Sequence, residues 1–161
     1  MSILCEDRKL FFWIWVVLVG GAYLVSTNYA YIKYKDNSKF LRILSVLTFF
    51  ACCGIAFSLK HDITTWNPKR IVHWVATGMY IACVALSVFI LLARNRNTYK
   101  GFKALMIVTL LIVGSIPVWL LTIGKSAMME MIPNALFQIM LFVIDYAMPV
   151  ETLPEKSYQR V

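Results

Sequence analysis

The fold is decided by residues 51–93, which read ACCGIAFSLKHDITTWNPKRIVHWVATGMYIACVALSVFILLA. Two apolar runs flank a short polar segment, and together with the residues just before it the first run is long enough to cross a hydrocarbon layer, which takes about 20 apolar residues in a helix. The stretch contains both histidines and three of the four cysteines. It therefore predicts two membrane helices. The polar connector between them holds more side chains that could form a functional site than any other loop of the chain.

The composition of the whole chain agrees with a membrane class. Of the 161 residues, 60% are hydrophobic and 15% are charged, and the mean hydropathy is +0.71. The charged residues fall in short clusters between long uncharged runs, which is how a polytopic helical protein spaces its loops. We therefore expect an all-α, polytopic integral membrane helix bundle.

A net charge of +8 would also suit a nucleic-acid-binding protein, but the basic residues flank apolar runs and form no basic patch with interleaved aromatics. Juxtamembrane Lys and Arg are instead attracted to anionic headgroups. The expected partners are thus membrane lipids, including anionic headgroups, and a membrane-protein partner or a second copy of the chain. Nucleic acid is not expected.

The cysteines predict free thiols. Cys5, Cys52, Cys53 and Cys83 include no Cys-x-x-Cys pair, and adjacent helical cysteines point in directions too different for an ordinary disulfide. Cys52 and Cys53 are interpreted as small packing residues. A thiol-redox membrane enzyme is disfavoured.

Taken in order, the chain predicts one transmembrane helix-bundle domain, 1–148, followed by a polar, disordered tail, 149–161. The start of the last helix is left open between Met128 and Pro133, and Pro117 is expected to kink the fourth helix because proline removes a backbone donor. The five expected membrane helices are residues 10–32, 41–59, 71–93, 104–123 and 128–148.

The distribution of Lys and Arg predicts the orientation. The loops at 33–42 and 94–103 and the tail hold ten, whereas the N-terminal segment, the 60–70 connector and Lys125 hold six. Basic loops are retained on the cytoplasmic side. The N-terminus is therefore expected outside and the C-terminus in the cytoplasm. The sequence does not indicate in which cellular membrane the protein lies.

On this threading a polar cluster lies at the outer face: His61, Asp62, His73 and Glu130. An ionisable group near the edge of an apolar run is costly unless it is paired, so a contact between His73 and Glu130 is one hypothesis. The alternative is that both side chains reach the headgroup layer and anchor their helices. Zinc accepts such ligands, but the close histidine spacing of a hydrolase is missing, and neither a metal nor a cofactor is expected.

A second candidate lies at the inner face, where Asp145 is one turn from the end of the last helix. Arg42 and Lys103 are within plausible reach of its carboxylate, as is Arg94. A carboxylate that serves transport normally sits nearer the midplane. An ion pair at the helix end is therefore favoured over a transport role.

The central stretch also resembles a known family. A Cys-x-Gly-Ile run at Cys52–Ile55, then a polar loop, then His73, Ala76 and a helix ending at Arg94, is similar to the DRAM/Sfk family of small multi-span proteins, the damage-regulated autophagy modulator group. Glu130, followed by Phe137, Phe142 and Tyr146, is loosely similar to the last helix of that family. The resemblance covers 42–148, although family members have six spans and a long luminal loop where this chain has a short basic one. It implies a non-enzymatic protein of membrane trafficking or lipid organisation.

Together these observations favour a non-catalytic multi-span protein that binds lipid or a membrane-protein partner. Two alternatives from other classes stay open: a small transporter, and a membrane enzyme that uses the outer His/Asp/Glu cluster. A transporter should show repeat symmetry or helices broken near the midplane. An enzyme should lose activity when His73 or Glu130 is replaced.

Overall fold

The computed structural model describes residues 9–57, 68–122 and 127–148, and within them it is all-helical with no β-strand. The predicted fold class, a bundle of helices, is thereby confirmed. The helices are α1 (Lys9–Lys33), α2 (Lys39–Phe57), α3 (Pro68–Asn95), α4 (Phe102–Thr122) and α5 (Ala127–Phe142), and α5 continues into a π-helical turn, η1 (Val143–Ala147). Residues 1–8, the whole connector between α2 and α3 (58–67), residues 123–126 and the polar tail (149–161) lie outside the described residues.

Each helix begins one to three residues before the expected position. The third begins at Pro68, where proline is preorganised for the first helical turn and loses no backbone hydrogen bond. The last begins at Ala127, which answers the question left open between Met128 and Pro133, and α5 continues through Pro133 as α4 does through Pro117.

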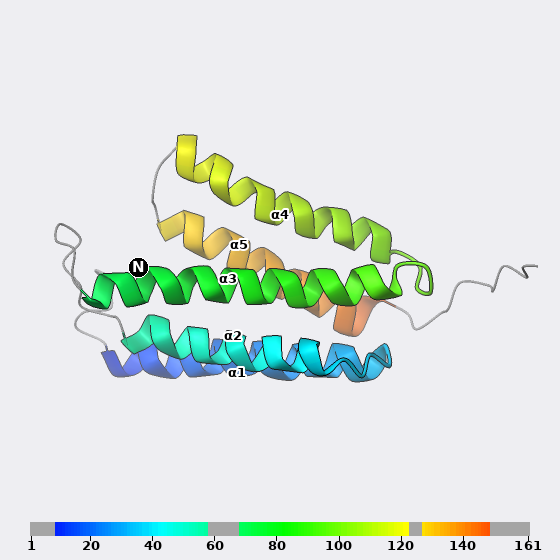
Figure 1. The fold of residues 1–161 in the computed structure, drawn as a ribbon, viewed down its shortest axis with the longest axis horizontal. Helices are drawn as coiled ribbons and strands as arrows, with labels where there is room; N and C mark the ends of the chain where they lie inside the picture. Colours follow the sequence, from blue (N-terminus) through cyan, green and yellow to red (C-terminus); the bar gives the residue numbers. More distant parts are fainter. Residues whose placement is uncertain (1–8, 58–67, 123–126, 149–161) are drawn as a thin grey trace, which may run out of the picture.

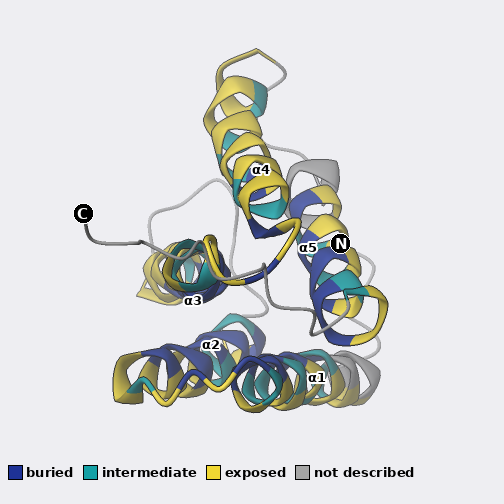
Figure 2. Cartoon of the chain, turned by 90° about the vertical axis from the view of Figure 1, so that its right-hand side faces the viewer, coloured by how far each residue is buried: buried dark blue, intermediate teal, exposed yellow. Residues whose placement is uncertain are grey.

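The helices stack in layers (Figure 1). The end-on view in Figure 2 shows α1 and α2 side by side, α3 and α5 above them, and α4 outermost. Accordingly α2 packs against both α1 and α3, whereas α4 packs against α3 and α5, and the end of α5 with η1 returns to α1. This return places the last turn of the described chain beside the end of the first helix.

The α2–α3 contact depends on small residues. A Cβ added at Gly54 would lie 3.1 Å from the Cβ of Ala76, so glycine is what allows the two helix backbones to approach here. Other small or polarizable side chains are buried in the same layer, among them Ala51, Cys52 and Cys83. The three cysteines within the described residues are free, as expected.

Apolar side chains also cover the outside of the bundle. Three of the described helices, α2, α3 and α4, are long and apolar enough to cross a membrane, and residues 132–147 form a shorter apolar helix. On α4 half of the large apolar side chains are exposed, including Leu110, Leu111 and Leu121, and few are buried. A soluble protein would not leave so much contiguous apolar surface in water. Composition and surface thus agree on a membrane helix bundle.

Candidate functional site

The polar cluster expected at the outer face lies largely beyond what the structure describes. His61 and Asp62 fall in the undescribed connector, and Glu130 lies in the first turn of α5 with an undescribed side chain. His73 lies in the second turn of α3 and is 8% exposed. The His73–Glu130 contact therefore stays a prediction, and non-additive destabilisation in a double-mutant cycle would support it.

Asp145, the carboxylate expected at the inner face, has partners other than the expected ones. Its side chain is 3% exposed, and its Oδ2 accepts a hydrogen bond from the Ser26 hydroxyl of α1. Arg42 and Lys103 are exposed, and neither forms an ion pair with Asp145 within the described ranges. The expectation assumed a regular α-helix to residue 148, whereas the wider π-helical turn leaves Asp145 beside α1.

Lys33 contacts this turn, where its ammonium group binds backbone. Its Nζ donates to the carbonyl oxygens of Ile144 (3.0 Å), Asp145 (2.7 Å) and Met148 (2.8 Å). The last carbonyls of a helix have no intrahelical partner, and a cation at a helix C-terminus is also favoured by the helix dipole. Lys33 therefore caps the last helix from the end of the first.

Tyr34 extends this cap. Its hydroxyl donates to the carbonyl of Ile144 at 2.8 Å, and its ring makes edge contacts with Tyr99 and Phe102, each at 4.8 Å between centroids. Burial raises the pKa of the Tyr34 phenol to about 12, and the Asp145 charge acts in the same direction. The phenol therefore stays a donor at physiological pH. We call Lys33 and Tyr34 with their three acceptor carbonyls the inner clamp.

The loop after α1 is also fixed by hydrogen bonds and an ion pair. Lys35 adopts φ +54°, and the amide of Asp36 donates to the Tyr31 carbonyl at 2.8 Å, which is the pattern of a Schellman helix end. The Asp36 carboxylate is buried, accepts from the Ser38 amide at 3.0 Å, and lies 3.5 Å from Nε of the half-exposed Arg94. The first basic loop is thus joined to the end of α3.

A third polar group lies deeper in the bundle. The Tyr80 hydroxyl of α3 donates to Oδ1 of Asn134 at 2.7 Å, and the Tyr23 hydroxyl of α1 approaches the same oxygen at 3.4 Å. The two tyrosine rings meet edge to face at 5.7 Å. Asn134 therefore links α5 to α1 and α3, a use of buried polar groups that is common between membrane helices.

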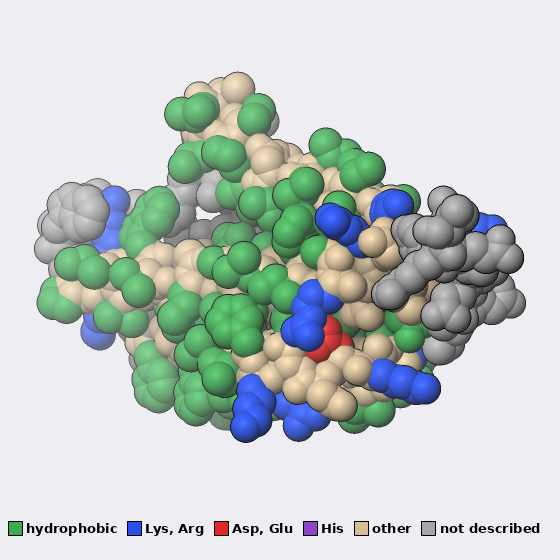
Figure 3. All heavy atoms as spheres, turned by 45° about the vertical axis from the view of Figure 1, so that its right-hand side comes forward, with side chains coloured by type: hydrophobic (Ala, Val, Ile, Leu, Met, Phe, Trp, Pro, Cys, Tyr) green, Lys and Arg blue, Asp and Glu red, His purple; other side chains and the backbone are tan. Residues whose placement is uncertain are grey.

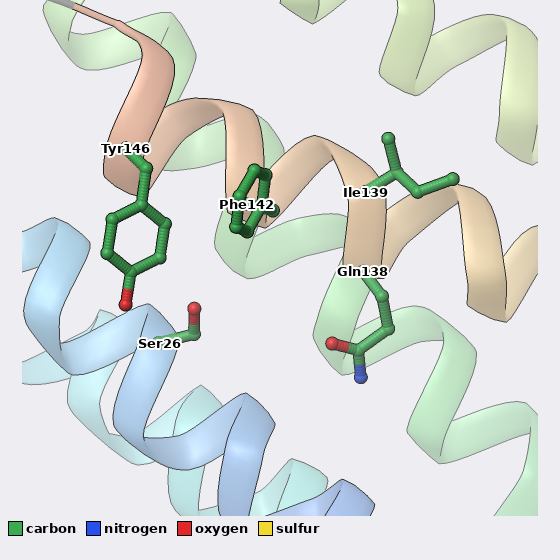
Figure 4. A pocket seen from close by; sticks show the side chains of 5 residues that line it. All are labelled: Ser26, Gln138, Ile139, Phe142 and Tyr146. Atoms are coloured by element: carbon green, nitrogen blue, oxygen red, sulfur yellow. The ribbon is translucent and has the colours of Figure 1, made fainter.

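An open groove runs between α1 and α5. It has a volume of about 360 Å³ and is lined by Ser26, Gln138, Ile139, Phe142 and Tyr146. Figure 4 shows Ser26 on α1 and the other four on α5 and η1, with the Tyr146 ring directed toward α1. The Tyr146 ring stacks on Tyr29 at 6.2 Å. Ser26, the residue that binds Asp145, is also a wall of this groove. Ser26 therefore connects the wall of the groove to the buried Asp145.

Sequence reasoning missed Ser26, Lys33, Tyr34 and Asn134. A serine or asparagine in an apolar helix indicates an interhelical hydrogen bond, but it does not say with which helix. Lys33 resembles any basic residue at a membrane-helix end. Its partners are backbone carbonyls more than a hundred residues away, and carbonyls leave no signal in a sequence.

Comparison of the chain with protein-family models, with curated proteins and with solved structures gives no match. The functional argument therefore starts from the chain's own geometry.

Proposed function

We propose that this chain is a non-catalytic multi-span membrane protein that binds membrane lipid or a membrane-protein partner. All five helices cross the bilayer, with the N-terminus outside and the C-terminus in the cytoplasm. A non-catalytic multi-span membrane protein is also what the resemblance to the DRAM/Sfk family implies. The buried polar groups of the described residues support a structural use, because most of them hold one helix to another.

One observation carries the lipid part of the proposal. Seven exposed basic residues come from the two turns at one end of the bundle and from the helix ends beside them, next to helices whose outer faces are apolar, and Figure 3 shows Lys and Arg gathered mainly toward that end. Each such residue near an anionic surface contributes about 1 kcal/mol of attraction. The seven residues are Lys35, Lys39, Arg42, Arg94, Arg96, Lys100 and Lys103.

The test is lipid selectivity of the full chain reconstituted in phosphatidylcholine vesicles, with spin-labelled phosphatidylglycerol or phosphatidylcholine as the reporter. We expect phosphatidylglycerol to be preferred at low salt and the preference to shrink as salt screens the charges. The double variant Arg96→Gln/Lys100→Gln should weaken the preference. The matched variant Arg96→Lys/Lys100→Arg keeps the charge and should retain it. Equal association of both lipids at low salt would contradict the proposal.

A further inference from the structure

Two buried contacts join the basic turn after α1 to the basic turn between α3 and α4. The Tyr34 ring packs against the rings of Tyr99 and Phe102, with 4.8 Å between centroids in each case. The Asp36 carboxylate lies 3.5 Å from Nε of Arg94. The three rings and the carboxylate belong to residues that are at most 6% exposed. The two turns therefore form one fixed surface.

Exposed cations are interleaved with these buried residues. Lys35 stands between Tyr34 and Asp36 in the sequence, so its backbone adjoins both contacts. Lys100 directly follows Tyr99, the ring that Tyr34 contacts. The buried contacts thus bring the backbones of cations from both turns to one small area. The three cations, which we call the three-cation site, are Lys35, Arg94 and Lys100.

Asp36 holds Arg94 through one edge of its guanidinium group. The contact is made by Nε, and the arginine side chain is still 54% exposed. A guanidinium group has five N–H donors in a planar fork, and a fork of this geometry matches two oxygens of one phosphate. The carboxylate is itself fixed, since it accepts a hydrogen bond from the Ser38 amide at 3.0 Å. Asp36 is therefore a positioning residue for the Arg94 fork.

The charges of this surface have no exposed acid beside them in the part of the chain whose side chains are described. The acidic side chains there, Asp36 and Asp145, are 6% and 3% exposed. Several cations at one place favour an anion with more than one charge. A phosphodiester headgroup has one charge and two free oxygens, whereas a phosphomonoester has three free oxygens and a charge of about −1.5 to −2 at pH 7.

We propose that the three-cation site binds the phosphomonoester headgroup of a phospholipid of the phosphatidic acid type, with Asp36 positioning the Arg94 fork. The inference rests on the proposed lipid-binding function and names the headgroup class. The site lies at the end of a bundle whose sides are apolar, where the headgroups of lipids packed along the helices meet juxtamembrane cations. Diester lipids such as phosphatidylglycerol bind the same surface through charge alone.

The test compares phosphatidic acid with phosphatidylmethanol, its methyl diester, binding to the detergent-solubilised full chain by native mass spectrometry. At pH 8 the monoester, with a second pKa of about 6, is dianionic, and the two lipids differ by one methyl group. We expect phosphatidic acid to bind at least about tenfold more tightly, the factor that one more hydrogen bond between charged groups supplies. Equal affinities would overturn the inference.

Charge-matched variants separate the site from the general field of the basic surface. Lys35→Gln should remove most of the preference for phosphatidic acid. Lys39→Gln removes the same charge from an exposed position at the start of α2 and should keep the preference. Arg94→Lys retains the charge but loses the fork, so it should weaken the preference as well. Equal losses in Lys35→Gln and Lys39→Gln would overturn the three-cation site.

Asp36→Asn distinguishes positioning from charge by the sign of its effect. The asparagine oxygen can still accept from the Ser38 amide, but the ion pair with Arg94 is lost and the chain becomes more positive. Charge alone would therefore tighten the binding of phosphatidic acid, whereas loss of positioning should weaken it several-fold. Tighter or unchanged binding would overturn the role of Asp36. If this variant fails to fold, Arg94→Lys tests the same fork.

The outcomes separate this inference from the proposed function. Equal binding of phosphatidic acid and phosphatidylmethanol, with phosphatidylglycerol still preferred over phosphatidylcholine in vesicles, would overturn the inference and leave the proposed function standing. Loss of both selectivities would overturn both. Glycerol 3-phosphate carries the same monoester without acyl chains and should compete weakly. Competition as effective as that of phosphatidic acid would overturn a lipid as the source of the phosphate.

Discussion

Lys33 connects the two ends of the described chain at the scale of single residues. Its ammonium caps the last helix while its backbone ends the first, so one side chain satisfies carbonyls that the bilayer interface would otherwise leave poorly hydrated. Asn134 has a similar role deeper in the bundle, where its side chain accepts hydrogen bonds from α1 and α3 and so joins three helices. The consequence is that a few polar side chains should carry a large share of tertiary stability.

The first prediction concerns this cap. Lys33→Met keeps the aliphatic stem and removes the ammonium, so it should lower the free energy of unfolding by about 1.5–3 kcal/mol, the contribution of a hydrogen bond to a charged group. Thermal melting in detergent micelles measures the change. Lys39→Met, at an exposed position on α2, is the control and should have little effect. Equal losses in the two variants would mean that the cap contributes nothing specific.

A second prediction concerns the Tyr80–Asn134 hydrogen bond. Tyr80→Phe and Asn134→Ala should each destabilise the bundle, and the double variant should cost less than the two single losses together. The coupling should be about 0.5–1.5 kcal/mol, the usual size for hydrogen bonds between membrane helices. A double-mutant cycle in detergent measures it. Strict additivity would show that the two side chains act independently.

At the scale of elements, the turn before α4 depends on one glycine. Gly101 has φ +89°, and a Cβ there would lie 2.8 Å from Cε of Met148. The position therefore combines a left-handed backbone with close contact to the end of the last helix. It fixes where α4 leaves the bundle and keeps that exit next to the inner clamp.

The third prediction is that Gly101→Ala destabilises the protein by about 1–2 kcal/mol, the cost of a left-handed conformation for an L-residue, with a further cost from moving Met148. Gly114→Ala is the matched control, because no atom lies within 4 Å of a Cβ added inside α4, and alanine is the better helix former. Its melting temperature should be unchanged or higher. A Gly101→Ala protein as stable as the parent would reject this explanation of the turn.

The helices could be predicted from sequence because apolar runs, Pro68 and the basic clusters are local signals. Their pairing could not, because faces rich in leucine and isoleucine can pack against many partners. The π-helical turn at Val143–Ala147 carries no proline or glycine to mark it. Sequence alone therefore favours an ion pair between Asp145 and the basic loops, whereas in the structure Asp145 accepts a hydrogen bond from Ser26. The His73–Glu130 hypothesis still awaits its test.

At the scale of the whole molecule, charge and hydropathy divide the bundle along its length. The exposed basic residues of the 34–42 and 94–103 loops gather at the end where the inner clamp closes the bundle, and the helix sides are apolar. An asymmetric charge distribution of this kind orients a helical protein in a membrane. This distribution is the observation that supports the proposed orientation.

The most direct measurement is the accessibility of position 97. Asn97 is exposed in the loop between α3 and α4, and Asn97→Cys adds a thiol there. We expect an impermeant maleimide to leave this thiol unlabelled in sealed cells and to label it after permeabilisation, whereas Thr64→Cys, in the connector proposed to lie outside, should label in both, with the parent chain as the blank. Labelling of Asn97→Cys in sealed cells would contradict the proposed orientation and the lipid surface built on it.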